Sequence, residues 1–232
     1  ESLPGEGPEW CAVLPRVWRD RDEPALRTLL ERARALGFTG VLIGNLGHLP
    51  LVRGLNFHLY GDYGLNVFNS RSLAYLKDKE LESACVSFEL RFAQIRDLKK
   101  VLRAEAIVYG RLPLMITENC LVQNETGCRL DRQGPCVPED GPCRCGQPNV
   151  LVDRTGAAFP LLPAYGHRTE IQNSKPLYLA DRPEHRRLGL AYARLRFTTE
   201  TAEECVSVVQ NYLDAAPAAG DFTRGLYERG VE

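Results

Sequence analysis

Histidine is scarce in this chain, and the familiar catalytic signatures are absent. The 232 residues include four histidines, at positions 48, 58, 167 and 185. The sequence has no G-x-S-x-G elbow, no P-loop, no H-E-x-x-H pair and no G-x-G-x-x-G after its first predicted strands. Hydrolysis or nucleotide binding by one of these common routes is therefore disfavoured.

Long apolar runs and a net charge of either sign are also lacking. No apolar run approaches the roughly 18 residues that a membrane span needs, so we expect a soluble, cytoplasmic protein without membrane contact. The formal charge of -1, from 29 basic and 30 acidic residues, excludes a strongly basic field over the whole molecule. Lysine is rare and arginine supplies most of the positive charge. Arginine suits phosphate or carboxylate binding, although genomic base composition would produce the same bias.

The remaining composition is that of a globular protein. Hydrophobic residues make up 44% and charged residues 25% of the chain, which is ordinary for a domain with a real core. The length fits one large domain or two small ones.

Strand and helix patterns alternate along most of the chain. Apolar strand-like runs occupy 11–18, 40–45, 57–60, 83–90, 105–111 and 190–198. Helical patterns occupy 22–36, 70–79 with Ser70 as the cap, 91–103 and 201–216. This alternation predicts a parallel α/β sheet, either open or closed as a (β/α) barrel. About six strands fall short of the eight of a closed barrel, so the fold class is a partial TIM-type barrel, completed by an upstream part of a longer polypeptide or by a partner chain.

The predicted organisation has four parts. Residues 1–10 form a linker or arm, 11–119 and 188–216 the barrel part, 120–187 a cysteine-rich metal loop with a small β insertion, and 217–232 a tail.

The cysteine-rich loop is the most distinctive feature of the sequence. Five of the eight cysteines follow one another as C-x7-C-x7-C-x6-C-x-C, at positions 120, 128, 136, 143 and 145. Clustered thiolates separated by glycine and proline suit zinc or an iron–sulfur cluster. Disulfides and unliganded thiols are the alternatives, but eight cysteines are far fewer than a disulfide scaffold carries. Zinc sites usually show paired C-x2-4-C knuckles, and only Cys143 and Cys145 are that close, so iron–sulfur is favoured.

Polar residues cluster where the predicted strands end. On a barrel, chemistry belongs at the carboxyl ends of the strands. The candidate catalytic residues are Asp62, Glu89 and Arg111, and the candidate substrate-binding residues are Arg16, Arg19, Asn45, Asn66 and Arg168. Structural alternatives stay open, because Asp62 could hold a turn, Glu89 could pair with a nearby arginine and Asn66 could cap a helix.

Seven segments together resemble a known family. They are YGDYGLNVFNS (60–70), SFEL (87–90), IVYGRLPLMITENC (107–120), LVDRTGAAFPLL (151–162), RTEIQNSKPLYLAD (168–181), LRFTTET (195–201) and FTRGLYERGV (222–231). In order and spacing they resemble the collagenase-like peptidases, family thirty-two of the unclassified peptidases, over residues 11–231. The resemblance implies a TIM-type barrel with an appended cysteine-bearing segment, and the C-terminal part of a long member.

The resemblance also implies a choice of chemistry. The family was named for proteolysis, while other members are oxygen-independent hydroxylation proteins acting on ribosomal RNA, on the tRNA wobble uridine or on the ubiquinone ring. Several of these carry a four-iron cluster on four cysteines. By this resemblance the metal ligands are drawn from Cys120, Cys128, Cys143, Cys145 and His167, and Cys136 is extra.

Three functions therefore stay open at this point. The first is an iron–sulfur-dependent enzyme that hydroxylates an RNA base or aromatic ring, with Asp62 or Glu89 moving protons and arginines holding an anionic substrate. The second is a metal-dependent peptidase, for which zinc would need an open coordination position. The third is a non-catalytic RNA-binding scaffold with a structural metal.

Overall fold

The computed structural model describes residues 8–126, 144 and 147–231, and its residues group into two compact units. The first unit consists of Glu1–Ile107, Pro183–Arg194 and Gly225–Glu232. The second unit consists of Val108–Arg182 and Leu195–Arg224. Each unit is described below by itself.

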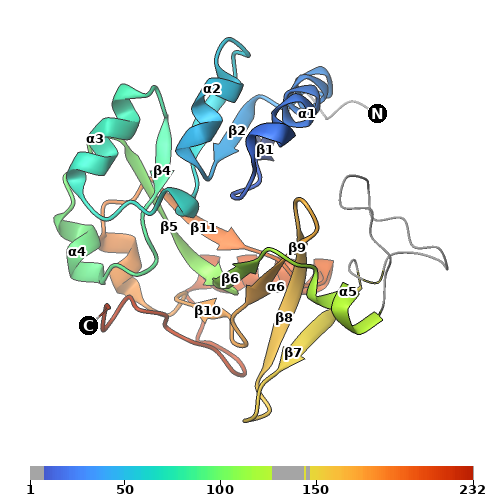
Figure 1. The fold of residues 1–232 in the computed structure, drawn as a ribbon. Coiled ribbons are helices and arrows are strands. Elements are labelled where there is room, and N and C mark those ends of the chain that lie inside the picture. The colour runs from blue at the N-terminus through green and yellow to red at the C-terminus, as the bar shows by residue number, and fades with distance from the viewer. Residues whose placement is uncertain (1–7, 127–143, 145–146, 232) are drawn as a thin grey trace. The chain divides into compact units, whose positions relative to one another are not determined.

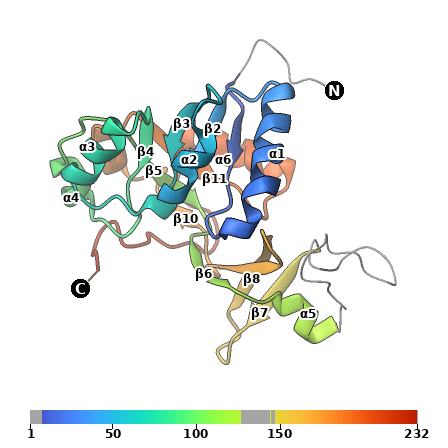
Figure 2. The ribbon, with the colours of Figure 1, turned by 45° about the horizontal axis from the view of Figure 1, so that its top comes forward.

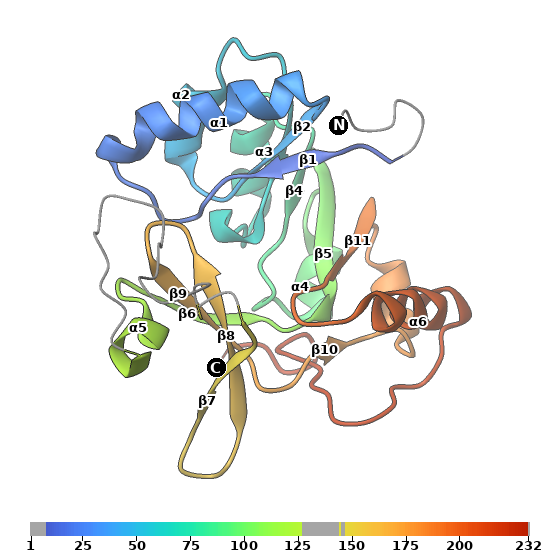
Figure 3. The same ribbon diagram turned by 90° about the vertical axis from the view of Figure 1, so that its right-hand side faces the viewer.

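The first unit is built on a parallel sheet. Its strands are β1 (Cys11–Val13), β2 (Gly40–Ile43), β3 (His58–Gly61), β4 (Ser83–Cys85) and the beginning of β5 (Arg103–Gly110), paired in that order and all parallel. A further strand, β11 (Tyr192–Arg196), pairs with β5. Val41, Ile43 and Ala84 are completely buried, as expected for strands covered on both faces. The curled sheet confirms the partial barrel expected from the sequence (Figure 3).

Four helices lie along this sheet (Figures 1 and 2). They are α1 (Glu23–Ala35), α2 (Leu49–Val52), α3 (Ser70–Asp78) and α4 (Phe92–Asp97). Short 3₁₀ turns occupy Asp20–Asp22, Leu46–His48, Tyr63–Leu65 and Pro183–Arg187. In α1, Leu26 and Leu30 are four residues apart and both about 1% exposed, so one face of the helix enters the core.

Two helix boundaries differ from the sequence prediction. The cap of α3 is Asn69 and not Ser70, because the Asn69 side-chain oxygen accepts from the backbone N–H groups of Arg71 and Ser72 at 3.0 and 2.9 Å. Helix α4 ends at Asp97, well before the predicted residue 103. The Lys100 ammonium donates to the carbonyl of Ile95 at 2.6 Å and thereby satisfies the end of the helix.

The second unit combines an antiparallel sheet with two helices. The sheet has the order β6 (Pro113–Thr117), β9 (Arg168–Gln172), β8 (Ala158–Ala164) and β7 (Asn149–Val152). Strand β10 (Leu177–Tyr178) pairs antiparallel with Tyr109 and Gly110 at the end of β5. The helices are α5 (Leu121–Thr126) and α6 (Ala202–Asp214). Strands β7 to β10 lie where the sequence predicted a small β insertion.

An aromatic core supports the second unit. Tyr109 and Tyr178 are buried, and Tyr212 of α6 packs against both with ring centroids 6.2 and 5.6 Å apart. The Tyr212 hydroxyl accepts the backbone N–H of Leu179 at 2.9 Å, so the polar end of this side chain is also used.

None of the helices in the described part of the chain combines the length and apolarity needed to cross a bilayer.

Candidate functional site

A buried trio of charged side chains, Asp62, Glu105 and Arg194, lies at the level of the sheet where β3 and β4 end. Asp62 directly follows β3, whereas Glu105 is the third residue of β5, in register with Cys85 at the end of β4, and Arg194 is the middle residue of β11. The Arg194 guanidinium donates from Nη1 to the Asp62 carboxylate and from Nη2 to the Glu105 carboxylate. The three side chains are 10%, 11% and 18% exposed, in the order Asp62, Glu105 and Arg194. The trio therefore lies in a largely desolvated environment, where charges interact strongly.

The trio is unbalanced in charge, because two carboxylates share one guanidinium. Burial raises the pKa of Glu105, and the nearby Asp62 carboxylate adds to the effect while Arg194 opposes it. Glu105 is thus a carboxyl group that holds its proton at higher pH than an ordinary glutamate does. Such a group can act as a general acid or base.

Cys85 lies beside the trio, since it is the register partner of Glu105 in the sheet. Its side chain is completely buried, and burial raises the pKa of its thiol. A protonated, inaccessible thiol is a packing group and not a nucleophile.

An arginine and two aromatic rings lie on the loops at the same end of the sheet. Arg16 follows β1, Tyr63 follows β3 and Phe88 follows β4. The Arg16 guanidinium lies over the Tyr63 ring at 5.4 Å from its centroid, and the Tyr63 and Phe88 ring centroids are 5.9 Å apart. All three side chains are half-buried. We call Arg16, Tyr63 and Phe88 the aromatic shelf.

Two side chains from the loop after β2 fix the backbone that carries Arg16. The Asn45 amide donates to the carbonyl of Arg16 at 3.2 Å, and Nε2 of His48 lies 3.1 Å from the carbonyl of Pro15. His48 is completely buried, and burial lowers its pKa to about 4. The imidazole is therefore neutral at pH 7, and its Nε2–H must be the donor to Pro15.

Close backbone packing holds the stem of Arg16 as well. A Cβ atom added to Gly64 would lie 2.5 Å from the carbonyl oxygen of Gly44 and 2.8 Å from Cδ of Arg16. Only glycine fits at position 64 without a shift of these neighbours. The shelf is thus built by tight contacts between the loops after β1, β2 and β3.

The remaining strand-end candidates of the first unit have mainly local contacts. Asn66 is exposed and ends the 3₁₀ turn in a left-handed conformation, with φ of 49°. The backbone N–H of Glu89 donates to the Ser87 hydroxyl at 3.3 Å, and that of Arg19 donates to the Asp22 carboxylate at 2.8 Å. Their predicted roles in catalysis or substrate binding stay predictions.

Arg111 and Arg168 belong to the second unit, where both guanidinium groups contact other parts of the fold. Arg111 Nη1 donates to the carbonyls of Asn173 and Ser174. Arg168 is 4% exposed, and its guanidinium donates to the carbonyl of Tyr165 and to the Glu118 carboxylate, each at 3.1 Å. These contacts explain both residues structurally, and their roles toward substrate stay predictions.

Two of the predicted metal ligands, Cys120 and His167, lie at one end of the β6–β9 pair. Thr117 and Thr169 are register partners, and the Thr169 hydroxyl accepts the N–H of Leu121 at 3.0 Å. Cys120 is therefore close to the start of β9, which His167 precedes, and its side chain is buried. The other predicted ligands, at positions 128, 143 and 145, and the extra cysteine at 136 lie outside the described residues.

The part of the chain with described coordinates contains no group of three or more His, Cys, Asp or Glu residues that could hold a metal. A buried thiol with an imidazole at the same end of a sheet suits one side of a metal site. The complete ligand set stays a prediction.

Glu105, Arg194 and Phe88 were not among the residues singled out in the sequence. Two of these residues do leave a signal in the sequence. EAIVYGR contains Glu105 and LAYARLRFT contains Arg194, so each pattern places a charge within a predicted strand. Charged side chains are almost never fully buried unless they are paired. A charge in such a strand therefore predicts a buried partner, although not which one.

The fold and site define an α/β protein with a partial barrel and polar groups at the carboxyl ends of its parallel strands. The family model described as Peptidase family U32 matches residues 6–150, more than half of the chain. The chain belongs to Peptidase family U32, which confirms the resemblance seen in the sequence. No match was found among the curated proteins.

Proposed function

We propose that this chain is an enzyme domain that uses an iron–sulfur cluster to hydroxylate an RNA base or another aromatic ring without molecular oxygen. The observation that carries the proposal is the buried, charge-unbalanced trio of Asp62, Glu105 and Arg194 at the level where β3 and β4 end. Family membership and the five clustered cysteines support it.

The energetics of the trio favour a role in chemistry over a role in stability. Removing each ion from water costs several kcal/mol, and apolar side chains of similar size often stabilise a fold equally well or better. A second carboxylate beside a single guanidinium increases that cost. Asp62 lies at the carboxyl end of β3, the kind of position where active sites of barrel enzymes lie. Costly buried charge beside such a position is typical of groups that act on a substrate.

The trio supplies a path for protons. Replacing a ring C–H bond by C–OH with water as the oxygen source releases two electrons and two protons, so the reaction needs a two-electron acceptor as co-substrate. A cluster held by Cys120 with ligands from Cys128, Cys143, Cys145 and His167 would pass the electrons to that acceptor when bound. Glu105, with its raised pKa, accepts and releases a proton, and Arg194 holds the Asp62 carboxylate next to it. Glu105 thereby joins Asp62 and Glu89 as a candidate proton carrier.

The proposal is tested by turnover under anaerobic conditions. The purified chain is incubated with RNA and, separately, with a hydroxybenzoate, each in the presence of a soluble two-electron acceptor such as methylene blue, and hydroxylated products are measured by mass spectrometry. We expect product with the unaltered chain and at least about a hundredfold less with Glu105→Gln, because a positioned proton carrier contributes roughly that factor. Equal turnover by Glu105→Gln and the unaltered chain would remove the trio from the reaction.

The metal is tested through Cys120. We predict that Cys120→Ser, purified anaerobically, loses most of its bound iron and sulfide while the sheet of the first unit stays folded, because the thiolates of a cluster site bind cooperatively. Iron, sulfide and zinc are counted by elemental and colorimetric analysis, with circular dichroism for the fold. Cys205→Ser, on α6, is the matched control and should keep its metal. Full metal content in Cys120→Ser would exclude Cys120 as a ligand.

Proteolysis is the second candidate, and the name of the family, Peptidase family U32, favours it. A hydrolytic zinc site would need an open coordination position and a general base. One bound zinc with cleavage of gelatin or casein would establish this alternative. One zinc without any turnover would instead favour an RNA-binding scaffold with a structural metal.

A further inference from the structure

The Arg16 guanidinium lacks the compensation that the other half-buried arginines have. Within residues 8–126, 144 and 147–231, it has neither an ion pair nor a hydrogen bond from its side chain, and its contact is the face of Tyr63 at 5.4 Å. Arg194, by contrast, is paired with two carboxylates. A partly desolvated cation without a counter-charge is a ready site for an anion.

The position of Arg16 is fixed at three points, although among the described residues its guanidinium contacts only the Tyr63 ring. Its carbonyl accepts from Asn45 at 3.2 Å, the preceding carbonyl of Pro15 lies 3.1 Å from Nε2 of the buried His48, and its stem packs against Gly64. Such preorganisation lowers the entropic cost of binding, because the side chain does not have to be ordered when the ligand arrives. Within the described residues, Arg16 is thus a cation held in place without a carboxylate partner.

Two aromatic rings, inclined to each other, lie beside this cation. Tyr63 and Phe88 come from different loops, and their half-buried rings meet at an interplanar angle of 49°. Aromatic side chains and arginine planes are the groups on which proteins stack planar rings. Tyr63 directly follows Asp62, so a ring bound here lies at the strand end that carries the buried trio.

We infer that the aromatic shelf of Arg16, Tyr63 and Phe88 is a binding subsite for a planar ring that carries an anionic group. The ring stacks on the shelf, and the Arg16 guanidinium binds its phosphate or carboxylate. This inference rests on the proposed function, because it names the surface that presents the ring to the trio. Asn45 and His48 are positioning residues for Arg16.

Binding of small probes to the full chain tests the shelf independently of turnover. The probes are uridine 5′-monophosphate, uridine and 4-hydroxybenzoate, measured by calorimetry or by ligand-observed NMR. We expect Arg16→Met to weaken uridine 5′-monophosphate at least about tenfold and uridine much less, since only the former offers an anion to the guanidinium. Tyr63→Leu should weaken all three probes, and Tyr63→Phe should restore them.

Arg96→Met is the matched control, because Arg96 is exposed on α4 and pairs with Asp97; it should bind all probes normally. The probe that binds more strongly, uridine 5′-monophosphate or 4-hydroxybenzoate, shows whether the subsite takes a nucleotide or a carboxylated aromatic ring. The proposed subsite would be overturned if no probe binds to the unaltered chain at millimolar concentration. It would also be overturned if Arg16→Met and Tyr63→Leu stay folded and bind the probes normally. A different outcome would separate the shelf from the proposed function. If Glu105→Gln binds the probes normally and neither the variants nor the unaltered chain turn over, the proposed function is refuted and the binding subsite is supported.

Discussion

The two ends of the first unit's parallel sheet use the same kinds of side chain under opposite conditions. At the level where β3 and β4 end, Arg194 and its two carboxylates are at most 18% exposed. At the amino end, Arg103, Glu82 and His58 form ion pairs with side chains that are 34–56% exposed. The difference in solvation decides what each cluster can do, because exposed pairs are screened by water and buried pairs are not.

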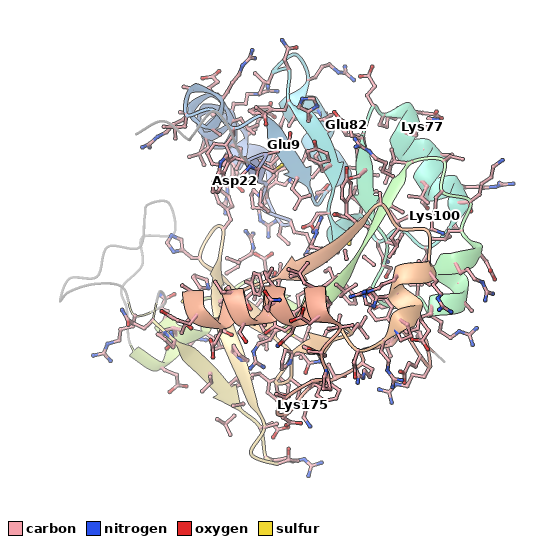
Figure 4. All side chains as sticks on the ribbon, turned by 180° about the vertical axis from the view of Figure 1, so that it is seen from behind. Glu9, Asp22, Lys77, Glu82, Lys100 and Lys175 are labelled. Atoms are coloured by element: carbon pink, nitrogen blue, oxygen red, sulfur yellow. The ribbon has the colours of Figure 1, made fainter. Side chains whose placement is uncertain are left out.

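The amino-end cluster is a set of surface ion pairs and hydrogen bonds that links neighbouring strands. The Glu82 carboxylate accepts from Arg103 Nη2 at 2.7 Å and contacts Nδ1 of His58, while Arg103 Nη1 donates to the Tyr192 hydroxyl at 2.8 Å. Glu82 and Glu9, both labelled in Figure 4, lie near Tyr60 of β3. Each group keeps access to water, so this arrangement costs little and stabilises little. The buried trio carries the costly charges, which is why we place the chemistry there.

Removing the shared guanidinium should have the largest effect. We expect Arg194→Met to lower the free energy of unfolding by about 3–5 kcal/mol, because it leaves two buried carboxylates without a counter-charge. Urea denaturation measures the change. The triple variant Asp62→Asn, Glu105→Gln, Arg194→Met removes all three charges and should recover most of the loss. A loss below about 1 kcal/mol in Arg194→Met would show that the trio is solvated like the amino-end cluster.

Filling the space at Gly64 should have the next largest effect. Gly64→Ala is expected to cost about 1–3 kcal/mol, since its Cβ would meet the Gly44 carbonyl at 2.5 Å and force the loops apart. Gly44→Ala is the control, because its nearest neighbour would be Cβ of Arg16 at an ordinary 3.7 Å. Thermal unfolding of both variants measures the difference. Equal stability of the two would mean that the loops carrying the shelf are loosely packed.

The pH dependence of stability should separate the two ends by sign. The pKa of Glu105 is raised in the folded state by burial, so the folded state binds the proton more tightly than the unfolded state does. Stability associated with Glu105 therefore falls as pH rises from about 4.3, the ordinary value, through the folded pKa. The melting temperature of the unaltered chain should drop relative to Glu105→Gln over this window.

Glu82 provides the matched control for that slope. Its hydrogen bond to His58 lowers its pKa, so its contribution is present above the ordinary value and is lost as pH falls through the folded pKa. Glu82→Gln should therefore be less stable than the unaltered chain at neutral pH, and this difference in stability should disappear in acid. A Glu105→Gln profile parallel to that of the unaltered chain would contradict the raised pKa of Glu105.

The smallest effect is expected at His58. Its contact with Glu82 raises its pKa, so the stabilisation is complete below about pH 6.5 and is lost as pH rises through the folded pKa. Because the side chain is 56% exposed, we expect His58→Ala to cost under about 1 kcal/mol even at pH 5.5, and less at high salt. Thermal melts at pH 5.5 and 8.5 in low and high salt measure this. A larger loss of stability that salt does not reduce would show that the His58–Glu82 pair is shielded from water in the same way as the buried trio.

Much of the first unit's architecture could be predicted from local patterns. The run GVLIGN predicts a buried strand, and the leucines of α1 predict its buried face, because each pattern depends only on neighbouring residues. The length of α4 was overestimated, since Lys100 ends that helix by binding its carbonyls, which periodicity does not reveal. Asp62 was identified from its place after a strand. Arg194 lies 132 positions from Asp62 and 89 from Glu105, and no local pattern links residues so far apart.

By itself, the sequence determined the family, the alternation of strands and helices, and the cluster of five cysteines, because these are properties of residue order and spacing. Only the tertiary structure decided which charges share a buried environment and which remain in water. The strand order β3-β4-β5, with β11 paired to β5, brings Asp62, Glu105 and Arg194 together in the first unit. Desolvation depends on every neighbour that excludes water, and that set of neighbours exists only once the sheet has formed.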